Sequence, residues 1–168
     1  MVELMAQVLI VDGYNIIGAW DELKELKKTD MGSARDQLIA TLAAYYPWHW
    51  ERIIIVFDGQ QFDWSSVDGV EVVFTKDKET ADTMIEKLAA GLTSYFQVEV
   101  ATSDYAELRA ASALGARVLS APVLKERLEE QRSSYRRLLY DQSDTRGIML
   151  NDILSKSVLD ILERLRRP

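Results

Sequence analysis

The chain has 168 residues, a length that predicts one domain with a hydrophobic core of its own. It contains no cysteine and a single histidine, His49, which excludes disulfides and cysteine-based zinc sites and argues against a Ser-His-Asp triad. The formal net charge is −7, which argues against tight binding of free nucleic acid. No apolar run is long enough to span a membrane, and no signal peptide opens the chain. We therefore expect a cytoplasmic protein, a monomer without membrane contact.

Strands and helices alternate along the chain. Apolar runs and helical periodicity predict, in chain order, strand 7–12, helix 31–45, strands 52–59 and 70–74, helix 79–92, strand 96–102, helix 104–114, strand 116–120 and helices 122–140 and 150–166. This alternation favours a three-layer α/β/α fold around a central, mostly parallel sheet. We expect one domain over residues 1–168, with the helices at 122–140 and 150–166 at its C-terminal end.

Three of the predicted strands end in an acidic residue. The stretches IVDG, VFDG and ATSD place Asp12, Asp58 and Asp104 at or just beyond the carboxyl ends of their strands. Each aspartate alone can also be explained as a turn former or a helix N-cap. If the strands are parallel neighbours, however, the three carboxylates converge at the edge of the sheet where α/β proteins bind their ligands.

A fourth acid comes from the helix that begins in ETADTMIEKL. Asp82 lies at the edge of the helix's apolar face, so we expect it to be partly enclosed. Glu79 and Glu86 lie three and four residues away on the same side. The alternative interpretation is a solvated acidic helix start, which the helix dipole favours.

Carboxylates held close together repel one another unless a proton or a cation neutralises them. A site of oxygen ligands without histidine or cysteine suits Mg²⁺ or Mn²⁺, and such an ion can promote phosphodiester hydrolysis by water. In the opening motif, Gly13 permits a tight turn and Asn15 can orient an acid or a water molecule. Tyr14 either stacks on a base or packs against the protein.

The cations are distributed unevenly. Residues 1–112 hold 9 Lys and Arg against 19 Asp and Glu, whereas residues 113–168 hold 11 against 8, and 9 of those 11 cations are arginines. Arginine beside an aromatic residue suits single-stranded RNA. The candidate RNA-binding residues are Tyr14, Arg132, Tyr135, Arg136, Arg137 and Arg146. A solvated helix with internal Glu–Arg pairs explains the arginine-rich helix equally well.

The four motifs VDGYN, VFDG, ETAD and TSD, in this order, resemble the YacP-like branch of the NYN domains, which are PIN-like nucleases. The resemblance implies a divalent-metal site formed by Asp12, Asp58, Asp82 and Asp104, with Glu79 as an additional ligand. It implies a catalytic role for Asp12, Asp82, Asp104 and Asn15. Many NYN domains carry a second acid two residues after the TSD aspartate. Here that position is Ala106, followed by Glu107, so the site holds a single ion or Glu107 substitutes for the missing acid.

The resemblance also implies an activity. YacP-like proteins resemble bacterial endoribonucleases, and one branch is thought to cut mRNA on the translating ribosome, so we expect a Mg²⁺- or Mn²⁺-dependent endoribonuclease acting on single-stranded RNA. The alternative is a non-catalytic RNA- or ribosome-binding module of the same fold. A phosphatase of the HAD type is disfavoured because Tyr14 stands where a second aspartate is needed. A P-loop NTPase is excluded because the GxxxxGK[ST] motif is absent.

Overall fold

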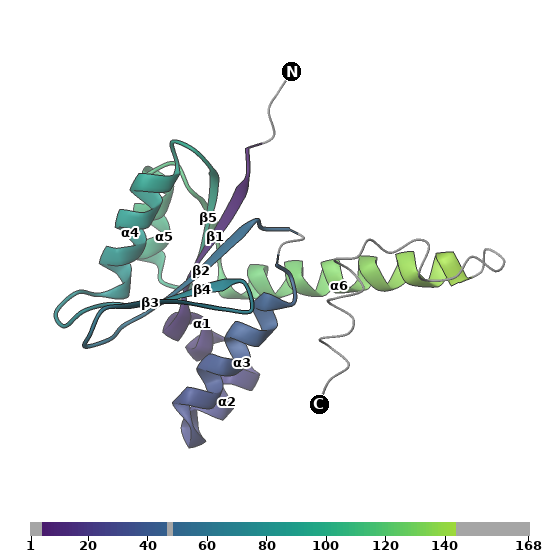
Figure 1. The fold of residues 1–168 in the computed structure, drawn as a ribbon, viewed down its shortest axis with the longest axis horizontal. Helices are drawn as coiled ribbons and strands as arrows, with labels where there is room; N and C mark the ends of the chain where they lie inside the picture. Colours follow the sequence, from purple (N-terminus) through teal and green to yellow (C-terminus); the bar gives the residue numbers. More distant parts are fainter. Residues whose placement is uncertain (1–4, 47–48, 144–168) are drawn as a thin grey trace. The chain divides into compact units, whose positions relative to one another are not determined.

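The computed structural model describes residues 5–46 and 49–143 (Figure 1). The chain divides into two compact units, Met1–Leu128 and Glu129–Pro168, and each is described here by itself. The first unit carries the sheet and every strand-end acid.

The first unit is built on a sheet of six strands in the order β3-β4-β2-β1-β5-β6. Within the described residues, all neighbouring strands run parallel except β3 and β4, which form an antiparallel pair. The mostly parallel sheet predicted from the alternating pattern is therefore confirmed. The strands are β1 (Gln7–Asp12), β2 (Arg52–Phe57), β3 (Asp63–Val67), β4 (Val70–Phe74), β5 (Gln97–Ala101) and β6 (Arg117–Leu119).

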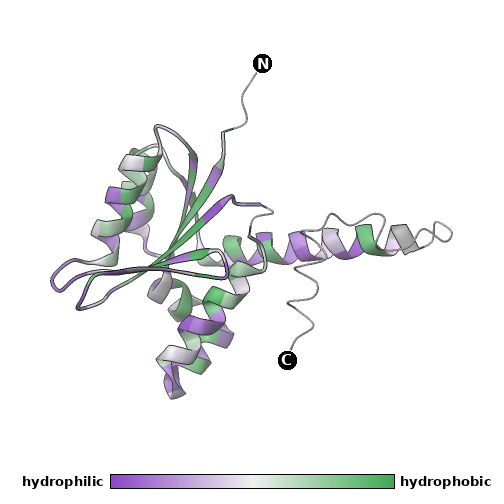
Figure 2. Cartoon of the chain, viewed as in Figure 1, coloured by the Kyte–Doolittle hydropathy of each residue, from purple (hydrophilic) through white to green (hydrophobic). Residues whose placement is uncertain are grey.

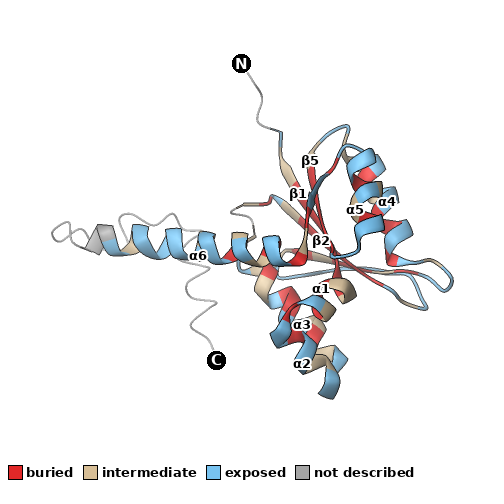
Figure 3. Cartoon of the chain, turned by 180° about the vertical axis from the view of Figure 1, so that it is seen from behind, coloured by how far each residue is buried: buried red, intermediate tan, exposed pale blue. Residues whose placement is uncertain are grey.

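Helices cover both faces of this sheet, which confirms the three-layer α/β/α architecture. One face packs against α1 (Gly13–Ala19), α2 (Asp21–Thr29), α3 (Met31–Ala43) and the first residues of α6 (Ala121–Ser143). The other face packs against α4 (Ala81–Leu92) and α5 (Tyr105–Ala113). The central strands β1 and β2 are apolar on both sides and lie buried between these layers (Figures 2 and 3).

Alternation along β1 divides its side chains between the two cores. Leu9 and Val11 belong to the core under α1–α3, whereas Val8 and Ile10 belong to the core under α4 and α5. All four are completely buried. Because β1 is the central strand that both cores share, its last residue, Asp12, is held in a rigid position.

Three elements have no counterpart among the predicted ones: α1, α2 and β3. The α1 sequence GYNIIGA contains two glycines, which are poor helix formers, and forms a helix because Ile16 and Ile17 bury against the sheet. The β3 sequence DWSSV is exposed along its whole length and lacks the apolar alternation of a strand. Tertiary contacts therefore decide both structures.

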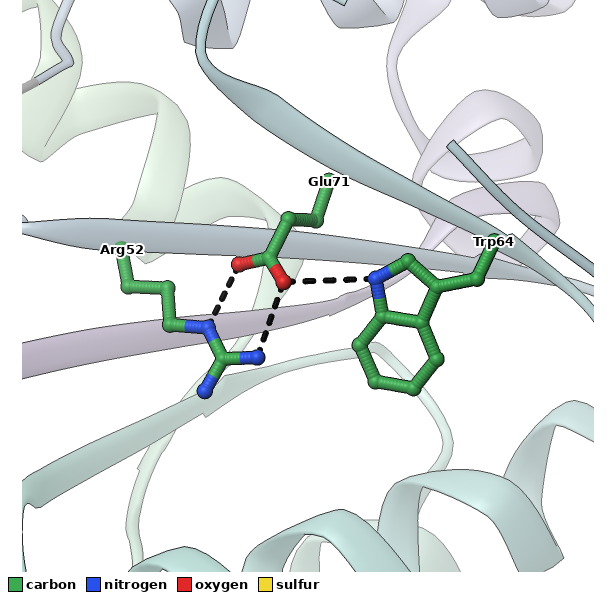
Figure 4. A network of polar contacts seen from close by, with 3 residues as sticks. All are labelled: Arg52, Trp64 and Glu71. Carbon is green, nitrogen blue, oxygen red and sulfur yellow. Dashed lines mark hydrogen bonds and ion pairs between the residues drawn. The ribbon is translucent and has the colours of Figure 1, made fainter. Parts of the chain in front are cut away.

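Strand β3 is anchored to the sheet through Glu71 of β4. Arg52 of β2 donates to both carboxylate oxygens of Glu71, at 2.5 and 2.8 Å, and the indole N–H of Trp64 donates to Oε1 at 3.3 Å (Figure 4). This contact joins three adjacent strands and fixes the orientation of the Trp64 ring on the exposed edge of the sheet.

The first residues of α6 belong to the first unit and form polar contacts within it. The indole N–H of Trp20 donates to the carbonyl of Ala121 at 2.9 Å. Arg127 and Trp50 each donate to the buried carboxylate of Glu99, at 2.7 Å in both cases. The helix predicted at 122–140 is thus α6, and the helix predicted at 150–166 lies outside the described residues. None of the described helices is long and apolar enough to cross a membrane.

Gly13 packs directly against a core aromatic residue. A Cβ placed on Gly13 would lie 2.1 Å from Phe57 Cε1, and Phe57 is completely buried. By contrast, a Cβ on Gly91 in α4 would meet no atom within 4 Å.

We expect a glycine-to-alanine substitution to have opposite effects on stability at these two positions. Gly13→Ala is expected to lower the free energy of unfolding by about 1–3 kcal/mol, because the ring of Phe57 has to move within a filled core. Gly91→Ala is expected to raise it by up to about 1 kcal/mol, because alanine favours the helix. Urea denaturation of both variants checks this. Equal effects would show that the contact with Phe57 does not determine the need for glycine.

Candidate carboxylate metal site

The strand-end acids meet at one edge of the sheet. The strands β2 and β5 are the two parallel neighbours of β1, so all three strands end at the same edge. Asp12 is the last residue of β1, Asp58 directly follows β2, and Asp104 lies three residues beyond β5. The convergence expected from the sequence is therefore present in the fold.

The tightest group of acids at this edge consists of Asp12, Asp82 and Glu107. One carboxylate oxygen from each lies within 4.8 Å of those of the other two. The three residues come from β1, α4 and α5, so the cluster sits where both helices of one layer meet the end of the central strand. Asp12 and Glu107 are buried, whereas Asp82 is exposed and more open than its place beside the apolar face of α4 predicted.

Glu107 is the most constrained member of the cluster. Both of its carboxylate oxygens are buried, and neither forms a hydrogen bond of normal geometry to any described residue. Burial raises the pKa of Glu107 to about 9, and the neighbouring charge of Asp12 adds to the rise. Without a cation, burial and the charge of Asp12 therefore favour the protonated form of Glu107.

The other two acids of the cluster are shifted in the same direction. Burial raises the pKa of Asp12, and the charges of Asp82 and Asp58 add to the rise, while hydrogen bonds with Glu107 and the N–H of Asn15 oppose it. Partial desolvation raises the pKa of Asp82, followed by the charges of Asp104 and Asp58. The carboxylates at the site thus bring together more negative charge than the neighbouring hydrogen-bond donors compensate.

Asp58 and Asp104 lie outside this cluster, and their carboxylates accept hydrogen bonds from the backbone near it. Asp58 Oδ1 accepts the N–H of Ala81 at 2.8 Å, which ties the start of α4 to the end of β2. Asp104 caps α5 by accepting the N–H of Ala106 at 2.8 Å and that of Glu107 at 3.3 Å. Each therefore has a structural contact, although the charge of each also acts on Asp82.

Asn15 joins two loops of the site. Asp12 Oδ1 accepts the N–H of Asn15 at 3.3 Å and so caps α1. The side-chain oxygen of Asn15 in turn accepts the N–H of Ser103, in the loop between β5 and α5. Asn15 thus fixes that loop next to Asp12.

The remaining candidates lie beside the cluster or away from it. Glu79 accepts a hydrogen bond from Lys87 and is outside the group of three. Tyr14 packs against Phe57 with ring centroids 5.0 Å apart, and its hydroxyl accepts from Arg35 at 3.0 Å. Tyr14 therefore packs against the protein, which is one of the two roles expected for it.

The predicted arginine surface belongs to the second unit. Four of its residues lie on α6 and are exposed: Arg132, Tyr135, Arg136 and Arg137. Arg146 lies outside the described residues. The arginines are therefore accessible, which RNA binding requires, but exposure by itself does not distinguish that role from a solvated helix.

The donor set fits a hard divalent cation. Three carboxylates converge, and the Glu107 carboxylate has no satisfactory partner in the described part of the chain. Oxygen-only sites of this kind suit Mg²⁺ or Mn²⁺. A cation would neutralise the mutual repulsion and occupy the unpaired oxygens of Glu107.

Comparison with known proteins shows the family to which this chain belongs. A model of the YacP-like NYN domain family matches residues 9–167. The chain belongs to the YacP-like NYN family. It is 41% identical over 166 residues to an uncharacterised protein named YacP from Bacillus subtilis, covering 95% of this chain and 96% of that protein.

Two crystal structures of the Bacillus subtilis protein Rae1, also named YacP, are similar to this chain. The first, of a mutant with one substitution, has a TM-score of 0.74 and 42% identity, and the match covers 96% of this chain and 95% of that one. The second structure has a TM-score of 0.66 and 41% identity, covering 95% and 94%. The relationship therefore extends over nearly the whole chain.

In this YacP-like NYN chain, Glu107 is the acid that the fold brings to the cluster next to the departure at Ala106. The sequence left open whether Glu107 replaces the acid that many NYN domains carry one residue earlier, and the fold brings Glu107 into the cluster. The sequence contained a usable pattern, because Glu107 and the buried Ala111 are four residues apart on one face of α5. The direction of that face toward Asp12 required the tertiary structure.

The buried glutamate predicts a distinctive pH dependence for the metal-free protein. The pKa of Glu107 in the folded state is about 9, above its ordinary value of 4.5. The folded protein therefore binds this proton more tightly than the unfolded chain does, and the free energy of unfolding falls as the pH rises from about 4.5 toward 9. In a chelating buffer, the unfolding free energy of Glu107→Gln relative to wild type should therefore rise from about pH 5 to about pH 8. The difference should grow by at most about 1.4 kcal/mol per pH unit.

Denaturant titrations at both pH values measure this difference. Glu86→Gln is the matched control, because Glu86 is an exposed acid of α4 and its loss changes the net charge equally. Parallel pH profiles for wild type and Glu107→Gln would contradict the assignment of a buried, protonated glutamate.

Proposed function

We propose that the chain is a divalent-metal-dependent endoribonuclease that hydrolyses single-stranded RNA. The observation that carries the proposal is the cluster of Asp12, Asp82 and Glu107, in which a buried carboxylate lacks a partner among the described residues. Membership of the YacP-like NYN family supports it. A pure binding module has no need of converging acids, which repel phosphate.

The three carboxylates have different positions in this proposal. Asp12 and Glu107 would hold the cation from the protein side, and Asp82 would hold it from the exposed side, where RNA can approach. Asp58, Asp104 and Asn15 keep the backbone of these residues in place. When bound, Mg²⁺ or Mn²⁺ would supply Lewis-acid polarisation of the phosphate and a lowered pKa of water.

Cleavage assays test this function directly. Wild type is expected to cut single-stranded RNA in Mg²⁺ or Mn²⁺ and to be inactive in a chelator. Asp12→Asn and Asp82→Asn should each reduce the rate by at least about 100-fold, because each removes a ligand charge where the transition state gains negative charge. Gel analysis of labelled RNA measures the rates, and thermal melts confirm that the variants fold.

Glu86→Gln serves as the control, because it removes an exposed acid from α4 outside the cluster. Cleavage that persists in both aspartate variants would overturn the metal-site assignment. Absence of cleavage in every metal and substrate tested would favour the alternative, a non-catalytic RNA- or ribosome-binding module.

We further propose that the substrate is mRNA on the translating ribosome in the cytoplasm. The net charge of −7 makes binding of free RNA weak at physiological salt, and a ribosome can supply position and local concentration. The exposed arginines of α6 offer a surface for RNA contact.

This proposal predicts a strong dependence on translation. Cleavage of an mRNA in a reconstituted translation system should exceed cleavage of the same naked mRNA by at least about tenfold at physiological salt, since the ribosome raises the effective concentration of the substrate. An inhibitor of translation initiation should abolish the difference. Equal cleavage of naked and translated mRNA would contradict a role for the ribosome while leaving the nuclease assignment intact.

A further inference from the structure

An open groove lies at the start of α4, between this helix and the loop that enters it from β4. Its volume is about 290 Å³, and all the residues that line it are polar or charged. They are Lys76, Asp77, Lys78, Glu79, Thr83 and Lys87. The volume exceeds that of a phosphate group, so the groove can admit a segment of RNA backbone.

The groove is positive within an acidic part of the chain. Three lysines and two acids line it, while residues 1–112 as a whole carry 10 more acids than cations. Lys87 is paired with Glu79. Lys76 and Lys78 are exposed and form no ion pair with any described residue. Two lysine side chains are thus available to an anion.

The groove and the cluster both take residues from the start of α4. Asp82 belongs to the cluster, and the next residue, Thr83, lines the groove together with Lys87, four residues further along the helix. An RNA strand that crosses this end of α4 would have both sites on its path.

Lys78 holds a costly backbone conformation at the tip of this loop. Its φ is 65°, in the left-handed region that glycine adopts more readily. A lysine in this conformation costs stability that a glycine would not, which is typical of residues with a role in binding.

A second loop with an exposed aromatic residue borders the groove. The N–H of Asp77 donates to the carbonyl of Gln60 at 2.9 Å, so the loop after β2 lies against the loop after β4 (Figure 1). Phe62 in the loop after β2 is 51% exposed, and its ring lies 6.5 Å from that of Trp64, which Glu71 holds in place (Figure 4). Exposed rings beside cations are typical of single-stranded RNA surfaces.

We propose that the groove binds a backbone phosphate of single-stranded RNA through Lys76 and Lys78, and that Phe62 stacks on a base of the same strand. This inference rests on the proposed nuclease function and names where its substrate lies. It adds to the arginines of α6 an RNA-contacting surface beside the carboxylates themselves.

Binding of a fluorescent single-stranded RNA, followed by anisotropy at low salt in a chelator, tests the groove without cleavage. The variant Lys76→Ala/Lys78→Ala should bind at least about fivefold more weakly, and the slope of log affinity against log salt should fall by about 0.7–1.4. The matched control is Lys24→Ala/Lys28→Ala, which removes the same charge from exposed positions on α2, over the other face of the sheet.

The stacking contact has its own pair of variants. Phe62→Ala should weaken binding at least about fivefold, whereas Phe62→Tyr, which keeps an aromatic face, should bind as wild type does. Thermal melts establish that each variant is folded.

The outcomes separate this inference from the proposed activity. If both lysine pairs weaken binding equally, or if wild type binds no RNA at low salt, the groove proposal is wrong, even where metal-dependent cleavage is observed. If binding depends on Lys76, Lys78 and Phe62 but no metal supports cleavage, the groove is supported and the nuclease assignment fails.

Discussion

The crowding of carboxylates at the carboxyl edge of the sheet is the constraint on which the site depends. Asp12, Asp82 and Glu107 bring their oxygens within 4.8 Å of one another, and two of the three side chains are buried. Three charges at this separation repel strongly in a poorly solvated setting. A proton on Glu107 relieves part of the repulsion in the metal-free protein, and a divalent cation would relieve more. Because folding holds these acids close together, the site favours the binding of a cation.

The two cores on either side of the sheet supply the rigidity that this arrangement requires. β1 is buried on both faces, so Asp12 cannot move away from its neighbours without disturbing both cores. Asp58, Asp104 and Asn15 add hydrogen bonds that fix the starts of α4 and α5 and the loop at Ser103. These three residues share the edge with the cluster, and the contacts they make are of the kind that hold metal ligands in position.

The proposed RNA substrate would have to bind beside an acidic site. The carboxylates themselves disfavour phosphate, so affinity has to come from nearby cations and aromatic rings. Lys76, Lys78 and Phe62 provide these groups at two loops that the bond between Asp77 and Gln60 holds together. The exposed arginines of α6, Arg132, Arg136 and Arg137, belong to the second unit.

The sequence by itself determined the alternation of strands and helices, the parallel sheet and the convergence of Asp12, Asp58 and Asp104, because apolar runs ending in acids are a local pattern. It did not reveal α1, α2 or β3, whose stability comes from burial against the sheet or from pairing with β4. The placement of Glu107 in the cluster, and of Asp58 and Asp104 as hydrogen-bonded neighbours, was likewise decided only by the tertiary structure. Helical periodicity identifies the buried face of α5, but the packing of α5 against β1 and α4 determines which acids that face meets.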